Sequence, residues 1–192
     1  MNEPLEPASQ AAPTVTKTML SVARELLETL LIALVLFGGL QIVVKNFRVT
    51  GDSMLPNFHD GQFLIVDKMS YRFSEPRRGD VIVFRYPRDE REDFIKRILG
   101  LPGETIEITD GTIYINGSPI TESYPLGGPT LTYHSLKVTL GEDQYFVMGD
   151  NRNYSSDSRA WGPITRRDII GRVWFSYWPP AQWGAFHPPS YP

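Results

Sequence analysis

The hydrophobic residues of this chain form one long continuous run near its start and many short runs after it. The long run, Leu26–Val44, carries a single charge, Glu28, and shows no polar face between Leu30 and Leu40. At ~1.5 Å per residue, a helix of this length spans roughly 28 Å, which is close to the hydrocarbon thickness of a bilayer. The pattern therefore predicts a single membrane-spanning helix, placed at residues 24–46.

Two alternatives fit this run less well. A buried helix of a soluble protein should show a polar face. A cleaved signal peptide needs small residues after its apolar core, where this chain has Val43–Phe47. Two basic residues lie close before the run and two lie close after it, so charge alone does not orient the helix. Residues 1–23, whose beginning is rich in Ala, Pro and Glu, are predicted to form a disordered leader.

Short apolar segments between turn residues fill the rest of the chain, which is typical of a mainly antiparallel β protein. Asp110-Gly111 is a strong hairpin signal, and Asn116-Gly117 marks another tight turn. Pro87–Asp93 and Asn151–Arg159 are interpreted as polar loops, and no second long helix is expected. The predicted strands are Phe47–Thr50, Gln62–Lys68, Val81–Arg85, Thr105–Thr109, Thr112–Ile115, Gln144–Met148 and Ile169–Phe175.

Composition narrows the possible chemistry. Cysteine is absent, which excludes disulfides, thiolate zinc sites and cysteine nucleophiles. The formal net charge is −3 and no basic stripe stands out, so nucleic-acid binding is not expected. Asp89, Glu90, Glu92 and Asp93 are interleaved with arginines, and this cluster is interpreted as solvated charge rather than as a metal site.

A candidate nucleophile follows the apolar run in the segment TGDSMLPNF, residues Thr50–Phe58. Gly51 allows unusual backbone angles, and Pro56 stiffens the chain three residues after Ser53. Such a turn can present the Ser53 hydroxyl with backbone N–H groups nearby. An ordinary turn fits the same string.

A base for Ser53 is harder to find. The histidines, His59, His134 and His187, lie in turn-rich or Pro-rich surroundings, and none forms an Asp-x-His pair. Lys96 is the other candidate, because its neighbours are apolar and a buried lysine can lose its charge and accept a proton. Alternatively, Lys96 and Arg97 form the polar face of a strand or short helix, and the residues alone do not decide between the two interpretations.

The third candidate element is the polar segment GDNRNYSSDSR, Gly149–Arg159. A solvated loop would look the same. However, its charged residues could pair into a buried scaffold, and one of its serines, Ser155, Ser156 or Ser158, could accept a hydrogen bond from a neutral lysine. The charged residues are Asp150, Arg152, Asp157 and Arg159.

Together these segments resemble the type I signal peptidases, also called leader peptidases, the membrane-bound Ser–Lys proteases of the S26 peptidase family. The resemblance rests on four segments in the family's order and spacing, and it extends over roughly Leu26–Trp178. The segments are TGDSMLPNF, RRGDVIVF, FIKRILGLPGE and GDNRNYSSDSR.

The resemblance implies a role for each matching residue. Ser53 is expected to be the nucleophile, with its backbone N–H in the oxyanion hole, and Lys96 the general base. Ser155 would orient Lys96, and Asp157 and Arg159 would form a structural ion pair.

Further supporting roles follow from the same resemblance. Asp150, Arg152 and Gly51 are expected to support the site. Met54 and Pro56 would lie in the substrate cleft. Some family members carry a serine at the position of Gly51, and without that hydroxyl the oxyanion hole should depend mainly on the backbone.

The implied protein is an endopeptidase that removes signal peptides from exported preproteins, cleaving after small residues, with no metal or cofactor. Its catalytic β domain, with the antiparallel signal-peptidase/LexA-like fold, is placed at residues 47–178, with a small accessory insertion at about 105–143 and a Pro- and aromatic-rich tail at 179–192. The leader would be cytoplasmic and the β domain on the extracytoplasmic side of the cell membrane or an equivalent energy-transducing membrane. Its expected partners are signal peptides and the lipid bilayer, and a monomer is expected.

Two rivals are considered. A self-cleaving repressor-type Ser–Lys protease would need an N-terminal DNA-binding domain, where this chain has an apolar run. A catalytically silent, membrane-tethered binding module would not need both Ser53 and Lys96 in matching contexts.

Overall fold

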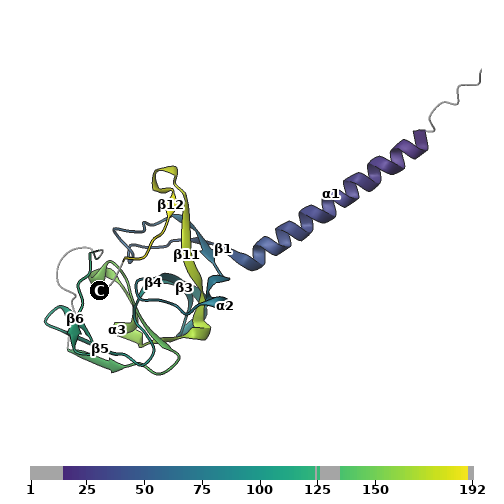
Figure 1. Cartoon of the computed structure of the whole chain (residues 1–192). Coiled ribbons are helices and arrows are strands. Elements are labelled where there is room, and N and C mark those ends of the chain that lie inside the picture. Colours follow the sequence, from purple (N-terminus) through teal and green to yellow (C-terminus); the bar gives the residue numbers. More distant parts are fainter. Residues whose placement is uncertain (1–14, 124, 126–134, 190–192) are drawn as a thin grey trace, which may run out of the picture. The chain divides into compact units, whose positions relative to one another are not determined.

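The computed structural model describes residues 15–123, 125 and 135–189, and it divides the chain into two compact units, residues 1–41 and 42–192 (Figure 1). The first unit contains helix α1 and the second contains the strands. The strands pair antiparallel throughout, so the expected mainly antiparallel β fold is confirmed.

Helix α1 spans Val15–Val43 and is longer than the predicted anchor. It begins nine positions before residue 24, so the disordered leader predicted for residues 1–23 is wrong over 15–23, while residues 1–14 lie outside the described part. No Gly or Pro interrupts the chain between Val15 and Phe37, and Arg24 pairs with Glu28 one turn later at 2.7 Å. These features extend a helix beyond its apolar section. Within it, Ser21–Val43 is long and apolar enough to cross a membrane.

The main sheet of the second unit has eight strands in the order β1-β2-β11-β3-β4-β9-β10, with β12 added to β11. The helix gives way to β1 at Val44, so the last three residues of the predicted anchor are strand rather than helix. The strands are β1 (Val44–Arg48), β2 (Phe63–Asp67), β3 (Val81–Tyr86), β4 (Asp89–Gly100), β9 (Gln144–Met148), β10 (Ile164–Thr165), β11 (Ile169–Trp178) and β12 (Gly184–Ala185).

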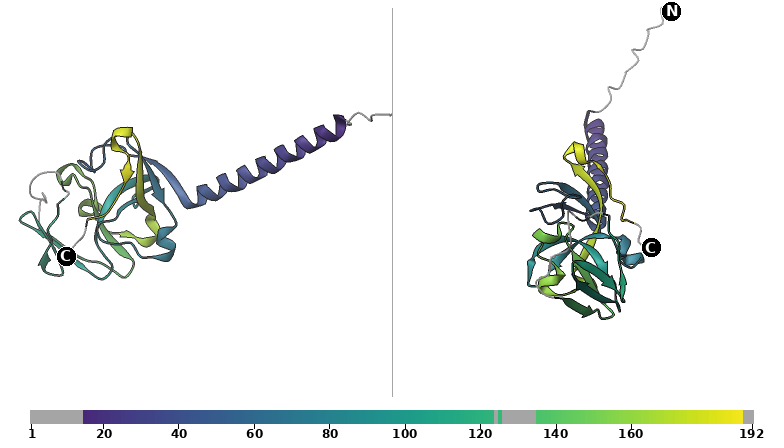
Figure 2. Two further views of the ribbon diagram at one scale, coloured as in Figure 1. Left: turned by 45° about the horizontal axis from the view of Figure 1, so that its top comes forward. Right: turned by 90° about the vertical axis from the view of Figure 1, so that its left-hand side faces the viewer.

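A second, smaller sheet has the order β7-β6-β5-β8. Figure 1 and the left view of Figure 2 show it at the end of the β unit away from β1. Its strands are β5 (Thr105–Thr109), β6 (Thr112–Ile115), β7 (Ser118–Pro119) and β8 (Leu136–Thr139). Short helical turns complete the unit: α2 (Ser70–Phe73), η1 (Arg152–Tyr154), α3 (Ser158–Trp161), η2 (Arg166–Asp168) and η3 (Pro180–Gln182).

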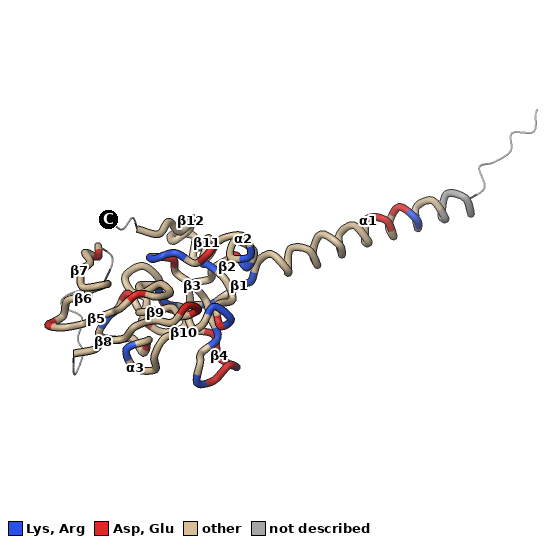
Figure 3. The backbone as a smooth tube through the Cα atoms, turned by 60° about the horizontal axis from the view of Figure 1, so that its bottom comes forward, with Lys and Arg blue, Asp and Glu red and all other residues tan. Residues whose placement is uncertain are grey.

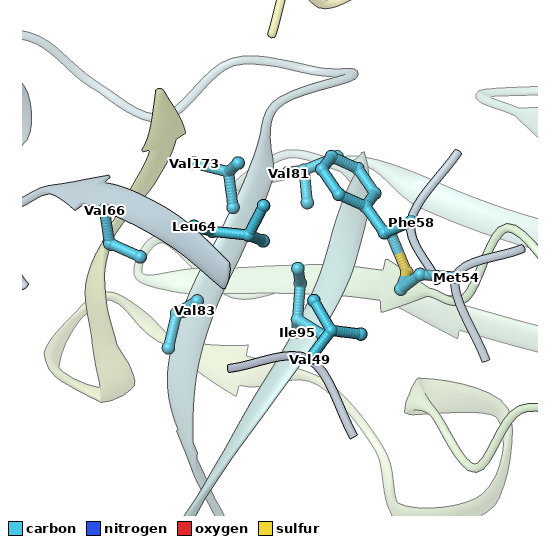
Figure 4. Close-up of a cluster of buried hydrophobic side chains, with 9 residues drawn as sticks. All are labelled: Val49, Met54, Phe58, Leu64, Val66, Val81, Val83, Ile95 and Val173. Carbon is cyan, nitrogen blue, oxygen red and sulfur yellow. The ribbon is translucent and has the colours of Figure 1, made fainter. Parts of the chain in front are cut away.

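The core beside the candidate nucleophile is a cluster of nine buried side chains, drawn in Figure 4. Alternate residues of β2, Leu64 and Val66, point into it, as a strand with one buried face requires. Met54 and Phe58, from the segment between β1 and β2, lie beside one another in the same cluster. The core therefore fixes both ends of the turn that follows Ser53.

The turn predictions are confirmed. Asp110 and Gly111 both have positive φ, 49° and 76°, which a two-residue hairpin turn of type I′ demands. Asn116 and Gly117 adopt the same pair of angles, 51° and 80°, in the following turn.

One segment prediction is wrong. The charged segment predicted as a loop belongs largely to β4, because Asp89 and Asp93 pair with β3. Its charged residues lie at the end of the β3–β4 hairpin, where the backbone is coloured red and blue near the β4 label in Figure 3. Residues 90–92 there are exposed, so this part of the strand needs no apolar face. The predicted Pro- and aromatic-rich tail contains β12, which pairs with β11.

Candidate active site

Ser53 lies in a tight turn between β1 and β2. Its backbone is held by hydrogen bonds from Leu55 N to Asp52 O (3.2 Å) and from Phe58 N to Met54 O (2.9 Å). Gly51, with φ of 80°, adopts a conformation that an L side chain would strain. Since the core fixes Met54 and Phe58, the partly exposed Ser53 hydroxyl is presented on a rigid turn.

Lys96 reaches Ser53 from β4, which settles the alternatives that its neighbours left open. Its Nζ lies 2.7 Å from Ser53 Oγ and 2.8 Å from the carbonyl oxygen of Ile95. The side chain is 4% exposed, so it is not part of a solvated polar face. Burial lowers the pKa of the Lys96 amine to about 8, although the negative charges of Asp157 and Asp150 act in the opposite direction.

The histidines do not take the place of Lys96. His59 is exposed after the nucleophile turn, His187 is exposed in the tail, and His134 lies outside the described residues. Within the described part of the chain, Ser53 Oγ has its hydrogen bond with a lysine amine and with no imidazole.

An open cavity of about 500 Å³ lies in front of Ser53 and Lys96. Residues that follow or end β1 line one part of it, the middle of β4 lines another, and Ser156 comes from the last polar segment. The lining residues are Phe47, Arg48, Thr50, Ser53, Glu92, Asp93, Phe94, Ile95, Lys96 and Ser156. Both long walls are extended segments, so the cavity suits an extended chain.

Met54 does not line this cavity. Its side chain is fully buried in the core beneath the turn, so the expectation that it lies in the substrate cleft is wrong in this structure. Pro56 is exposed but is not among the residues that line the cavity.

The Asp157–Arg159 ion pair is present, at 2.8 Å between Asp157 Oδ2 and Arg159 Nη2. Asp157 is fully buried and also accepts a hydrogen bond from Gly149 N at 3.1 Å. Arg159 donates to the carbonyl oxygen of Arg152 at 2.6 Å. The polar segment is therefore closed on itself rather than solvated.

Asp150 pairs outside its own segment, with Arg97 of β4. Two hydrogen bonds, 2.7 and 2.6 Å, join the guanidinium to the carboxylate, and the two side chains are 2% and 0% exposed. Asn57 Nδ2 donates to the same carboxylate at 2.8 Å. Asp150 thus connects the nucleophile turn, the strand of Lys96 and the last polar segment. Sequence reasoning missed Arg97, although a charged residue beside Ile98 and Leu99 signals a buried partner.

Arg152 is held by a residue that the sequence did not point to. Its Nη1 and Nη2 lie 2.5 and 2.6 Å from the carboxylate of Glu122, and its Nε donates to Gly149 O at 3.0 Å. The two side chains are 2% and 9% exposed. Glu122 comes from the turn-rich region after β7, where no periodicity could have revealed it.

Ser155 lies close to the nucleophile but is not bonded to Lys96. Its Oγ is buried and has no hydrogen-bond partner among the residues that the structure describes. A Cβ at Gly149 would lie 2.3 Å from Ser155 Oγ and 2.5 Å from Ser53 O. Only glycine therefore leaves room for both of these groups to pack against the backbone at residue 149. Asn151 N donates to Ser53 O at 3.0 Å and fixes that approach. The role expected for Ser155 stays a prediction.

Metal ligation finds no support in the residues that the structure describes, since no group of three or more His, Cys, Asp or Glu side chains converges there. The arrangement instead provides a hydroxyl, a buried amine and an open cavity beside them. These groups can perform acyl transfer by a serine nucleophile.

Known proteins are similar in sequence to most of this chain. The family described as signal peptidase, peptidase S26, matches residues 23–178. A probable signal peptidase I-1 of Synechocystis sp. is 41% identical over 169 residues, which cover 84% of this chain and 85% of that protein. The signal peptidase I of Leptolyngbya laminosa is 40% identical over 195 residues, covering 97% and 94%. A solved signal peptidase I from Enterococcus faecalis, 34% identical, covers 52% of this chain and 97% of its own, with a TM-score of 0.46.

The Asp150–Arg97 pair should be a major source of stability. The substitution Asp150→Asn leaves the Arg97 guanidinium buried without its counter-charge, and we expect a loss of about 3 to 5 kcal/mol in the free energy of unfolding. Urea unfolding of the full chain in detergent, followed by tryptophan fluorescence, measures this. The matched control is Glu107→Gln, whose partner Lys137 is largely exposed; it should cost about 0.5 kcal/mol or less. Equal losses in the two variants would contradict the assignment.

Proposed function

The chain belongs to the signal peptidase family, peptidase S26, and on that premise we propose that it removes signal peptides from exported preproteins with a Ser53–Lys96 dyad. Membership confirms the resemblance drawn from the four segments and makes the protein a hydrolase of a serine protease family. The observation that carries the proposed mechanism is the 2.7 Å contact between Ser53 Oγ and the buried Lys96 Nζ.

The proposed reaction begins with neutral Lys96. Its Nζ accepts the proton of Ser53 while Oγ attacks the carbonyl carbon of the scissile bond. The protonated amine then donates to the leaving nitrogen, the C–N bond breaks, and an acyl-enzyme remains on Ser53. Lys96 next takes a proton from water, which hydrolyses the ester and regenerates the serine.

Charge on the tetrahedral oxygen needs a donor. The backbone N–H of Ser53 is the candidate, because the Ser53 nitrogen donates to no acceptor within the described ranges. The Ser53 carbonyl oxygen, in contrast, already accepts a hydrogen bond from Asn151 N. Gly51 offers no hydroxyl to add, which supports an oxyanion hole made mainly by the backbone.

Ser155 is proposed to orient Lys96 during turnover. The support is its buried Oγ, which has no hydrogen-bond partner within the described part of the chain and lies against Gly149 beside the nucleophile. A buried hydroxyl without a hydrogen bond is costly, so rotation of Ser155 toward the Lys96 amine would satisfy both groups.

Substrate is proposed to bind as an extended chain between the end of β1 and the middle of β4, with small residues before the scissile bond. The apolar stretch of α1 is proposed to anchor the protein in the membrane, with the β unit on the extracytoplasmic side. Trp174, Trp178 and Trp183 are exposed on the β unit, and indoles favour the interface between lipid and water.

Removing either member of the dyad should abolish cleavage. Ser53→Ala lacks the nucleophile and Lys96→Ala lacks the base, so we expect each to lower kcat/KM by at least ~10³-fold. Incubation of the purified full chain with a preprotein, followed by gel analysis, measures this. Lys137→Ala, which removes an exposed lysine, is the control and should cleave normally. Substantial cleavage by either dyad variant would sink the mechanism.

The activity should rise with pH through the titration of Lys96. Because the pKa of its amine is lowered to about 8, only about a tenth of the enzyme has the neutral base at pH 7. We expect kcat/KM to increase up to about pH 8 and to level off above it, measured from about pH 6 to about pH 10. Lys137→Ala should reproduce the profile. A rate independent of pH across this range would rule out Lys96 as the base.

Ser155→Ala should weaken turnover without abolishing it. Losing an orienting hydrogen bond is expected to lower kcat by about tenfold, with little change in KM. Ser74→Ala is the control, because Ser74 is an exposed serine that does not line the cavity. Kinetics equal to those of the unmodified enzyme at every pH would argue against the role of Ser155.

A further inference from the structure

The chain beyond the end of the family match, at residue 178, folds back onto the β unit. It passes through η3 and forms β12, where Gly184 and Ala185 pair with β11. Phe186 N then donates to Trp174 O at 2.9 Å, which fixes the position of the Phe186 backbone. The tail therefore delivers one side chain, Phe186, to a defined place.

That place lies between Phe58, in the nucleophile turn, and Arg97, the residue after Lys96 in β4. On one side, the Phe186 ring packs on Phe58, with 5.4 Å between ring centroids and 45° between the planes. Phe58 ends the nucleophile turn and shares its core cluster with Met54, the residue after Ser53. Figure 4 shows Phe58 and Met54 together in this cluster.

On the other side, the Phe186 ring faces the Arg97 guanidinium, with 5.3 Å from Arg97 Cζ to the ring centroid. The edges of that guanidinium already donate to Asp150 and to Gly79 O. A ring over its face adds cation–π attraction and completes the exclusion of water. Arg97 is consequently only 2% exposed, and it directly follows Lys96 in β4.

We infer that Phe186 is a positioning residue, which holds the nucleophile turn against the strand of Lys96 by packing on Phe58 and covering the Arg97–Asp150 pair. The inference rests on the proposed function for its catalytic consequence. Phe186 touches neither substrate nor reacting atoms, and it acts through Phe58 and Arg97.

The geometry defines what its loss would do. Without the ring, water reaches the Arg97 guanidinium, the attraction to Asp150 weakens, and the end of the nucleophile turn loses a packing partner. The separation of Ser53 Oγ and Lys96 Nζ then varies more. Since a misplacement of about 1 Å can cost on the order of 10²-fold in rate, a looser dyad should lower kcat and leave substrate binding nearly unchanged.

The test compares three variants of the full chain in detergent, with a signal-peptide substrate and separate determination of kcat and KM. Phe186→Leu keeps an apolar side chain but removes the ring, and it should lower kcat about tenfold with KM unchanged. Phe186→Tyr keeps the ring and should restore the rate. Phe73→Leu makes the identical change at a phenylalanine that is 83% exposed, in α2, and it should be close to normal.

Three kinetic results would overturn the inference: a normal kcat for Phe186→Leu, no rescue by Phe186→Tyr, or an equal loss in Phe73→Leu. The last would mean that losing a phenylalanine ring lowers kcat whatever the ring contacts. If the unmodified enzyme cleaves no signal peptide, the proposed function fails instead.

A second measurement needs no activity. In urea unfolding, the midpoint shift of the double variant Phe186→Leu/Asp150→Asn should be smaller than the sum of the shifts of the two single variants. Both substitutions remove parts of one buried group. Additive shifts would show that Phe186 and the ion pair are independent, and they would overturn the inference whatever the enzyme cleaves.

Discussion

The structure of the site depends on keeping one amine out of water. Lys96 can act as a base near neutral pH only because burial penalises its charged form, and that burial needs a well-packed strand on a fixed sheet. The nearby carboxylates of Asp157 and Asp150 oppose this effect, because their negative charges favour the ammonium form of Lys96 and raise its pKa. Each of these carboxylates is paired with an arginine, Asp150 with Arg97 and Asp157 with Arg159, which limits the opposing effect.

The polar scaffold around the dyad explains why its members come from distant segments. Asp150 accepts hydrogen bonds from Asn57 in the nucleophile turn and from Arg97 in β4, while Asn151 holds the carbonyl oxygen of Ser53. The last polar segment is thus the common support of nucleophile and base. Gly149 belongs to the same support, because a side chain there would separate Ser155 from the Ser53 backbone.

Local patterns predicted what is local in this fold. Short apolar segments between turn residues predicted β2 and β9, and the dipeptides Asp110-Gly111 and Asn116-Gly117 predicted both turns around β6, because these features depend on neighbours in sequence. Pairing across the sheet was different: Arg97 and Asp150 are 53 positions apart, and Glu122 meets Arg152 from a region without periodicity. The contact of Lys96 with Ser53, over 43 positions, was one of two interpretations that the neighbours of Lys96 left open, and only the family resemblance chose it. Met54 was misplaced because the resemblance locates a residue along the chain and not the direction of its side chain.

Consecutive residues of β4 show how one strand provides both the reactive and the structural cation. Lys96 and Arg97 point to opposite faces, as alternation in a strand requires, and both are almost completely buried. A lysine amine can respond to burial by losing its proton, whereas a guanidinium remains charged and must be paired. Accordingly, Lys96 meets a hydroxyl and a carbonyl oxygen, and Arg97 meets a carboxylate and an aromatic face. Exchanging the two residues would place a permanent charge beside Ser53 and a base where only structure is needed, so their order along β4 decides which face of the strand can be catalytic.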